Sequence, residues 1–310
     1  ILKHPHHVSA RCNLGALLTR AGKAEEAAEL LRESIEINPT HAESHSNLGD
    51  ALKELGEHGQ AEFSYRKAVS LDPSNFPLHS NLAMLSASML STLQPYLSDL
   101  RRFSDEIHSK ICEPFSEWLA SKDPADLRVG FVSGDFRSHP VGYFLERLLM
   151  ELQSSSTELF AYPTTSESDA ITSRIKPLFD TWSPLVGLED ADAAQKIHGD
   201  GIHVLIDLSG HTAKNRLPIF SRKPAPIQVS WLGYFASTGL PEMDYILGDP
   251  YVTPTAEEDH FVETIWQLPE SYLCFTPPSD DVEVAPLPAS INRFVTFGCF
   301  NNLARMTDDV

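Results

Sequence analysis

The stretch Arg128–Phe144, RVGFVSGDFRSHPVGYF, decides the fold of the second part of the chain, because the pattern of apolar residues changes there. Residues 129–133 form a short apolar run rich in β-forming residues, and a polar loop follows it. An apolar stripe at helical spacing comes next, at Phe144, Leu145, Leu148, Leu149 and Leu152. Strand, loop and helix in this order predict an α/β domain.

Further strands are expected downstream, at Leu159–Tyr162, Asp180–Ser183, His203–Leu208, Ile227–Trp231 and Tyr245–Leu247. A helix is expected through Ala191–His198. Because predicted helices alternate with strands only in part, we expect an open, mostly parallel sheet over residues 127–290, with one or two irregular connections. A Pro-rich hinge at 277–288 and a last strand at Phe294–Cys299 are expected to begin a second α/β domain, truncated here at 291–310.

Two sequence markers upstream share one period. The pairs His4-Pro5, Asn38-Pro39 and Asp72-Pro73 lie 34 residues apart, and so do Asn13-Leu14, Asn47-Leu48 and Asn81-Leu82. A 34-residue period that ends in Pro is typical of tetratricopeptide helix pairs. The alternative, a series of unrelated amphipathic helices, does not explain two coinciding periods. Residues 1–84 are therefore predicted to form an α-solenoid of tetratricopeptide repeats, which hold protein partners, so any chemistry is expected downstream.

The repeats have a predicted internal pattern. Leu14, Ala16, Leu17 and Leu18 form a helical stripe, and residues 21–23 interrupt it before a second helix. The small residues Ala27 and Ala61 occupy the same place in successive repeats, where paired helices approach closely. The segment 85–126 is predicted to contain linking helices, one of which docks on the next domain through Phe103, Ile107, Ile111, Phe115 and Trp118.

Composition excludes several classes of partner. A net charge of -19 argues against nucleic acid or an anionic membrane as the main partner, since both require clustered Lys and Arg. The four cysteines are scattered without CxxC pairs, which favours reduced thiols in a cytoplasm-like compartment. No apolar run reaches about 18 residues, so a soluble protein is expected. The chain begins within a repeat and stops on a polar segment, and we expect a fragment at both ends.

Three loops are expected at one edge of the sheet, beyond the carboxyl ends of parallel strands, where α/β proteins bind ligands. The loop 134–140 carries Asp135 and His139, and the helix that begins near Gly142 could direct its amides at an anion. Loops 209–212 and 232–239 follow two other strands. The loop 134–140 has no GxGxxG pattern, so a nicotinamide dinucleotide site is not expected. The alternative for His139 and His211 is a structural or solvated histidine, and Asp135 could simply cap the helix.

No metal site is predicted. Asp190-Ala-Asp192 resembles a DxD metal motif, but it stands at an Ala-rich helix start, where Asp commonly caps. His4-Pro-His-His7 includes the Pro that ends a repeat, and no second set of ligands accompanies it. The basic residues Arg216, Arg222 and Lys223 are interpreted as a solvated face rather than a phosphate site.

Several segments together carry a resemblance to a known family. After the repeats come RVGFVSGDFRSHPVGYF, HVLIDLSGHT at 203–212, RKPAPIQVSWLGY at 222–234, MDYILGD at 243–249 and FGCFNNLARM at 297–306. In this order they resemble the protein O-linked N-acetylglucosamine transferases, in particular the bacterial members. The resemblance implies a GT-B fold, with two Rossmann-like halves facing a cleft, of which this chain contains the first.

The resemblance also implies an activity. Members transfer N-acetylglucosamine from UDP-GlcNAc to Ser or Thr hydroxyls of proteins, with inversion and without a metal or other cofactor, and their repeats present the acceptor. The active-site histidine of the family corresponds to His139, and Asp135 is its motif partner. The sequence leaves open whether this histidine acts as a general base or orients the donor. Donor binding is assigned to Pro140, Val141, His211, Leu232, Gly233, Asn302 and Arg305.

The chain departs from the family pattern at several positions. Val141 replaces a Thr of animal members, and Arg305 replaces a Lys, which changes a compact ammonium into a planar fork. Phe235-Ala236 stands where many members have Pro-Gly. Since the second half is missing, we expect this chain alone to be inactive or nearly so. Two alternatives stay open: a repeat scaffold with a decayed transferase domain, and a related enzyme that transfers another sugar.

Overall fold

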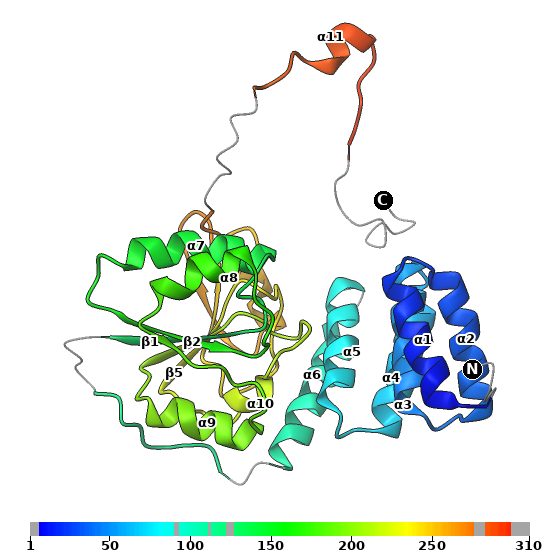
Figure 1. The fold of residues 1–310 in the computed structure, drawn as a ribbon, viewed down its shortest axis with the longest axis horizontal. Helices are drawn as coiled ribbons and strands as arrows, with labels where there is room; N and C mark the ends of the chain where they lie inside the picture. Colours follow the sequence, from blue (N-terminus) through cyan, green and yellow to red (C-terminus); the bar gives the residue numbers. More distant parts are fainter. Residues whose placement is uncertain (1–5, 90–92, 111–112, 122–126, 276–282, 299–310) are drawn as a thin grey trace. The chain divides into compact units, whose positions relative to one another are not determined.

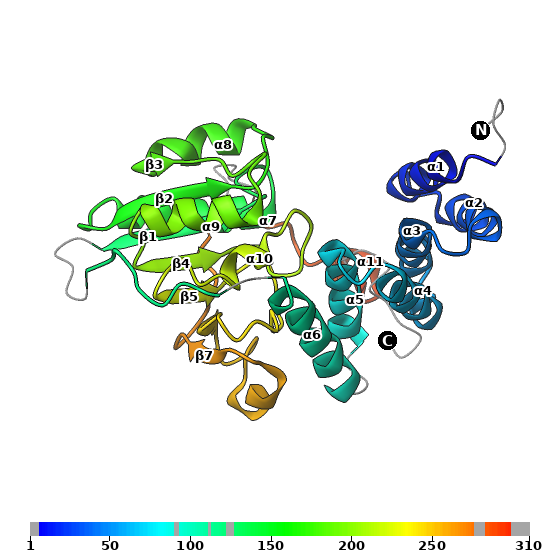
Figure 2. The same cartoon turned by 90° about the horizontal axis from the view of Figure 1, so that it is seen from below.

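The computed structural model describes residues 6–89, 93–110, 113–121, 127–275 and 283–298 (Figures 1 and 2). The chain divides into two compact units, residues 1–64 with 277–310, and residues 65–276. None of the helices in the described part is long and apolar enough to cross a membrane.

The first unit is built from paired helices, which confirms the predicted solenoid. The helices are α1 (Val8–Arg20), α2 (Ala24–Ile37), α3 (Ala42–Glu54) and α4 (His58–Leu71), the last of which continues into the second unit. Gly22 and Gly56, one repeat apart, have φ of 75° and 76° and end the first helix of each pair. Glycine suits this left-handed position because it has no Cβ to clash with its own backbone.

Small residues occupy the closest contacts between repeat helices, as predicted. Ala27 and Ala61 are fully buried, and a Cβ on Gly15 would lie 2.6 Å from Cγ of Leu31. The predicted stripe on the first helix is wrong in part. Leu14 and Leu17 are exposed, and Cys12 with Gly15 faces the core instead, because α2 packs against that side of α1.

The second unit begins with α5 (Phe76–Met89) and α6 (Leu93–His108). The prediction that helical spacing continues to Trp118 is wrong, since α6 ends at His108 and the described residues 113–121 contain no helix. Phe115 and Trp118 nevertheless dock on the α/β part, as expected of them. The Phe115 amide donates to the carbonyl of Arg222, and the Trp118 indole donates to that of Lys223, each over 2.9 Å.

A seven-stranded sheet forms the centre of the second unit, and all its neighbouring strands pair in parallel. Its order is β3-β2-β1-β4-β5-β6-β7. The strands are β1 (Arg128–Ser133), β2 (Glu158–Pro163), β3 (Thr181–Trp182), β4 (Val204–Asp207), β5 (Ile227–Ser230), β6 (Tyr245–Gly248) and β7 (Thr264–Gln267). β7 was not predicted from the sequence, because it is an edge strand in which exposed residues alternate with half-buried ones.

Helices cover both faces of the sheet (Figure 1). One face carries α7 (Pro140–Leu152) and α8 (Ala170–Ile175), and their apolar residues share a core with β1 and β2. The other carries α9 (Asp190–Gly199) and α10 (Leu217–Phe220), whose core also includes Phe103 and Ile107 of α6. Two 3-10 turns, η1 (Lys176–Leu178) and η2 (Thr255–His260), complete this unit.

The predicted strand at 294–299 is wrong over its described part. Residues 294–298 follow the short helix α11 (Pro288–Asn292) and are not assigned to a strand, and residue 299 lies outside the described residues. An extended segment becomes a strand only by pairing with a neighbour, and the described residues offer this segment none.

Candidate functional site

The loop after β1 lies at the point where the strand order reverses. The chain runs outward from β1 to β2 and β3, then returns to place β4 on the other side of β1. Because the loops after β1 and β4 lead away in opposite directions, a crevice opens at their carboxyl ends, which is where open α/β sheets bind ligands. This geometry brings residues 134–140 and 208–216 to one place.

The shape of the loop after β1 is set locally. Oγ of Ser133 accepts the amide of Asp135 over 2.9 Å and turns the chain. At the other end of the loop, a Cβ on Gly142 would overlap the carbonyl oxygen of Arg137. Glycine is therefore needed for the loop to fold back on the first turn of α7.

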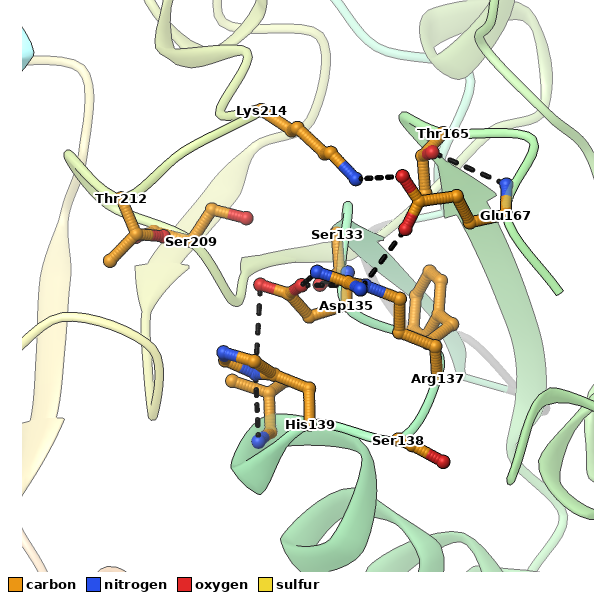
Figure 3. A network of polar contacts seen from close by, with 12 residues as sticks. Ser133, Asp135, Arg137, Ser138, His139, Thr165, Glu167, Ser209, Thr212 and Lys214 are labelled. Carbon is orange, nitrogen blue, oxygen red and sulfur yellow. Dashed lines mark hydrogen bonds and ion pairs between the residues drawn. The ribbon is translucent and has the colours of Figure 1, made fainter. Parts of the chain in front are cut away.

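Asp135 and His139 lie together, as the sequence predicted for a pair on one loop (Figure 3). Asp135 is 6% exposed, and its Oδ2 is 3.6 Å from Nδ1 of His139. His139 is also the N-cap of α7, where its Nδ1 accepts the amide of Val141 over 3.3 Å. The capping role that the sequence analysis considered for Asp135 therefore belongs to the histidine.

A network of charged side chains surrounds this pair (Figure 3). Nε and Nη2 of Arg137 lie 3.2 and 3.1 Å from Oδ1 of Asp135, and its Nη1 lies 3.0 Å from Oε2 of Glu167. Nζ of Lys214 lies 2.6 Å from Oε1 of Glu167. The hydrogen bond from Lys214 lowers the pKa of Glu167. Two cations and two carboxylates thus join the loops after β1, β2 and β4.

Lys214 has an unusual backbone conformation. Its φ is 65°, a left-handed conformation that a side chain rarely adopts. Its carbonyl accepts the hydroxyl of Thr164, at the end of β2, over 2.8 Å. The side chain and the backbone of Lys214 therefore both contribute to the contact between the loops after β2 and β4.

His211 lies in a different environment from His139. It is 1% exposed, and its Nε2 donates to the carbonyl of Thr238 over 2.9 Å. Its Nδ1 is 3.1 Å from Oγ of Ser80 on α5, from which it accepts. Both ring nitrogens form hydrogen bonds with other protein groups, so the ring links α5 to the loops after β4 and β5. This is the structural role considered above as the alternative for this histidine.

Burial lowers the pKa of His211 to about 4. The folded protein therefore favours the neutral ring, and the stability that this provides is complete above about pH 6.5 and is lost as the pH falls toward 4. We expect the difference in free energy of unfolding between wild type and His211→Gln to decrease by about 3 kcal/mol between neutral pH and about pH 4. Urea unfolding of both proteins over this range measures it.

The comparison with the variant is needed because other buried groups titrate in the opposite sense. Burial raises the pKa of Asp207 to about 6, so its contribution to stability increases as the pH falls below that value. Asp207 is present in both proteins and cancels in the difference. A difference that stays constant with pH would contradict the assignment of a neutral, buried ring to His211.

The loops after β4 and β5 interlock at Gly233. A Cβ on Gly233 would overlap the carbonyl oxygen of Leu208, and a Cβ on Gly210 would overlap the ring of Tyr234. The preceding residue, Leu232, has φ of 75° and is half-buried. The Leu-Gly pair that the family resemblance assigns to donor binding thus stands where two site loops touch through their backbones.

A buried carboxylate holds the far end of the loop after β5. Glu263 is 3% exposed and accepts the hydroxyl of Ser237, the amide of Thr238 and the hydroxyl of Thr238. Burial raises the pKa of Glu263. Sequence reasoning missed this residue, because it precedes an edge strand far from any motif and only the tertiary structure brings it to residues 237–238.

Comparison with known proteins identifies the family. The sequence model of glycosyl transferase family 41 matches residues 69–276, and a tetratricopeptide repeat model matches residues 9–74. The chain belongs to glycosyl transferase family 41. Its fold, repeats followed by a Rossmann-like domain, is the repeat region and first half of a GT-B glycosyltransferase, as the sequence predicted.

Relatives of this family 41 chain are named as transferases. A protein of Petunia hybrida, named as the probable UDP-N-acetylglucosamine–peptide N-acetylglucosaminyltransferase SPINDLY, is 36% identical over 206 residues, which are 65% of this chain and 22% of that protein. The UDP-N-acetylglucosamine–peptide N-acetylglucosaminyltransferase of Caenorhabditis elegans is 37% identical over 47% of this chain and 13% of its own length. A mutant O-GlcNAc transferase of Thermobaculum terrenum matches in structure with a TM-score of 0.89 and 33% identity, over 98% of this chain and 58% of that one.

The family 41 chain therefore spans about a fifth of the length of the curated relatives in plants and less of the nematode one.

The remaining donor residues predicted from the sequence have different places in the structure. Pro140 begins α7, and Val141 is buried in the core that it shares with Phe136 of the loop and Leu145 of the helix. Asn302 and Arg305 lie outside the described residues.

The described part of the chain contains no group of three or more His, Cys, Asp or Glu side chains placed to hold a metal ion. Asp190 of the DxD-like motif forms an ion pair with Arg216 instead.

The interpretation of Arg216, Arg222 and Lys223 as a solvated face is wrong for two of these residues. Arg216 also donates to the carbonyls of Leu185 and Leu188, and Lys223 is half-buried and pairs with Asp244.

A cavity of about 260 Å³ lies next to the charged network, but Asp135 and His139 do not line it. One wall is α5, with Phe76, Pro77, Ser80 and Asn81, and the other is the loop after β4 together with Asp190 of α9 and Pro218 of α10. Lys214 belongs both to this wall and to the network. The cavity therefore opens beside the candidate site, on the side of α5.

Proposed function

We propose that this chain is the repeat region and first catalytic half of a protein O-GlcNAc transferase, which moves N-acetylglucosamine from UDP-GlcNAc to Ser or Thr hydroxyls. The observation that carries the proposal is the Asp135–His139 pair at the switch point of a family 41 domain. The names of relatives in plants and a nematode support this donor and a peptide acceptor.

The proposed reaction is a displacement at the anomeric carbon. The acceptor oxygen bonds to that carbon as the bond to the UDP oxygen breaks, so the configuration inverts, and the hydroxyl proton must be taken up. His139, whose side chain is 38% exposed, can meet the donor or acceptor, while the carboxylate of Asp135 lies behind its ring. We further propose that Pro140, Leu232 and Gly233 line the sugar site and that Asn302 and Arg305 contact the nucleotide.

Partners and location follow as parts of the same proposal. The repeats present acceptor proteins, which suits a solenoid of helix pairs. A net charge of -19 supports neither nucleic acid nor an anionic membrane as a partner. Without CxxC pairs and with scattered cysteines, a cytoplasmic location is proposed. We also propose that the transfer needs no metal ion, and that cationic side chains neutralise the leaving diphosphate.

The test uses a protein that joins this chain to a second family 41 half. We expect calorimetry to detect UDP-GlcNAc binding that excess UDP abolishes, and His139→Ala to lower kcat for transfer to a protein acceptor by about 100-fold or more. His260→Ala is the matched control, because the side-chain contact of His260 in the described part of the chain is a long one, 3.8 Å to Glu257, and the variant is expected to leave kcat unchanged.

Other outcomes would point to the alternatives. Absence of binding at millimolar donor would overturn the transferase assignment in favour of a repeat scaffold. UDP-glucose that displaces UDP-GlcNAc and supports faster transfer would keep the enzyme class and change the sugar. Transfer that stops when a chelator is added would contradict the proposed metal independence.

A further inference from the structure

Two groups compete for Nδ1 of His139, the amide of Val141 and the carboxylate of Asp135. The amide of Val141 can only donate, so the 3.3 Å hydrogen bond requires Nδ1 without a proton. The Asp135 carboxylate can only accept when it is ionised, so a hydrogen bond to it requires Nδ1 with a proton. Since Oδ2 of Asp135 is 3.6 Å away, too far for a good hydrogen bond, the geometry favours the Val141 bond and the tautomer with its proton on Nε2.

This arrangement places two acceptors, Nδ1 and Oδ2, next to each other in a partly buried site, which is unfavourable unless the carboxylate is stabilised from another direction. Arg137 supplies that stabilisation. Its Nε and Nη2 both lie within 3.2 Å of Oδ1, the other oxygen of Asp135. Hydrogen bonds from a guanidinium to a carboxylate are stronger than those between neutral groups, and its planar fork fixes the carboxylate in direction.

Arg137 is itself held in place. Its Nη1 contacts Glu167, which also accepts from Lys214 over 2.6 Å, so the guanidinium lies between two carboxylates (Figure 3). Glu167 comes from the loop after β2, and Lys214 from the loop after β4. These contacts keep the fork of Arg137 on Asp135 instead of leaving it free in solvent.

We infer that Arg137 is a positioning residue that holds the Asp135 carboxylate and thereby selects the tautomer of His139 with its proton on Nε2. In this role Arg137 acts through Asp135, with which its guanidinium forms two hydrogen bonds. The consequence rests on the proposed function: His139 would then meet the donor with an N–H group, as an orienting hydrogen-bond donor, and would not be ready to take a proton at Nε2.

The tautomer can be measured in the 310-residue chain, without donor or activity. Nitrogen and carbon NMR shifts of labelled histidine rings at neutral pH distinguish the two neutral forms, and the His139 signals are identified by their loss in His139→Gln. We expect wild type to show mainly the Nε2–H form. In Arg137→Gln the ratio of Nδ1–H to Nε2–H is expected to rise about fivefold or more, because the freed carboxylate then attracts a proton on Nδ1.

Three further variants make the result specific. Arg174→Gln removes another two-bond pair, with Glu146 at 2.6 and 3.0 Å on the surface of the same unit, and is expected to leave the ratio unchanged. Arg137→Lys keeps the charge without the fork and should restore the wild-type ratio in part. Glu167→Gln leaves Arg137 present but less constrained, so a smaller shift in the same direction is expected.

The inference is overturned if wild type shows mainly Nδ1–H, or if Arg137→Gln leaves the ratio as it is in Arg174→Gln. If Arg137→Gln does not fold, Glu167→Gln and Arg137→Lys decide, and an unchanged ratio in both overturns it. Because no donor is present, these results do not depend on the proposed transferase activity, which the binding and transfer experiment above tests separately.

Discussion

Replacing Gly233 with Ala is expected to lower the free energy of unfolding by about 4 kcal/mol, as expected when a side chain is forced against buried backbone. The new Cβ would overlap the carbonyl oxygen of Leu208 and approach Cα of Ser209, which are backbone atoms and cannot move aside as a flexible side chain can. Either the loop after β5 or the loop after β4 must shift. Thermal or urea unfolding of the 310-residue chain measures the loss.

The matched control is Gly199→Ala. A Cβ there meets no atom within 4 Å, and Gly199 is the last residue of α9, so the change is expected to be neutral or slightly stabilising. Because Gly233 also belongs to the proposed sugar site, we expect Gly233→Ala to weaken donor binding as well as stability in a protein with both halves. Equal unfolding midpoints for the two variants would contradict the close packing of the two loops.

Replacing Glu263 with Ala is expected to cost about 4 kcal/mol of the free energy of unfolding, since three hydrogen-bond donors lose a buried acceptor. These donors are the hydroxyl of Ser237 and the amide and hydroxyl of Thr238. The Ser237 hydroxyl in turn accepts the amides of Gly239 and Val262, so the loss extends to the backbone on both sides. Urea unfolding at neutral pH measures this change.

Two companion variants separate charge from size. Glu263→Gln keeps the volume of the side chain, but its amide NH₂ group faces at least one of the three donor groups that the carboxylate accepts. We expect a smaller loss of the free energy of unfolding than for Glu263→Ala. Glu270→Gln changes an exposed carboxylate and should lie within about 0.5 kcal/mol of wild type. If Glu263→Ala unfolds like Glu270→Gln, residues 237–238 do not depend on the buried carboxylate for their position.

The main elements could be predicted because their signals are local. The 34-residue period shows where repeat helices break, and the apolar runs at β1, β2, β4 and β5 need no tertiary information to stand out. Where the local conformation depends on distant partners, the predicted secondary structure was wrong. Phe115 and Trp118 continue a helical spacing, yet their backbone and indole hydrogen bonds go to residues 222–223, which the sequence does not place near them.

The candidate site shows the same division. Asp135 and His139 could be paired from the sequence because they share one short loop after a predicted strand. Arg137 lies between them in that loop, but its role depends on Glu167 from the loop after β2, and that partner appears only when the strands are ordered. His211 was predicted beside the donor, and the hydrogen-bond partners of its ring, Ser80 and Thr238, are 131 and 27 residues away along the chain, where the sequence does not reveal them.

The sequence by itself determined the repeat array, the α/β class of the second part, the family and the loop that carries Asp135 and His139, because period, apolar pattern and motif order are properties of neighbouring residues. Only the tertiary structure decided which loops meet, which histidine is buried, and which of two groups Nδ1 of His139 bonds. The physical reason is that burial and hydrogen-bond partners depend on strand order and on close backbone contacts such as that of Gly233 with Leu208, which join residues far apart in the chain.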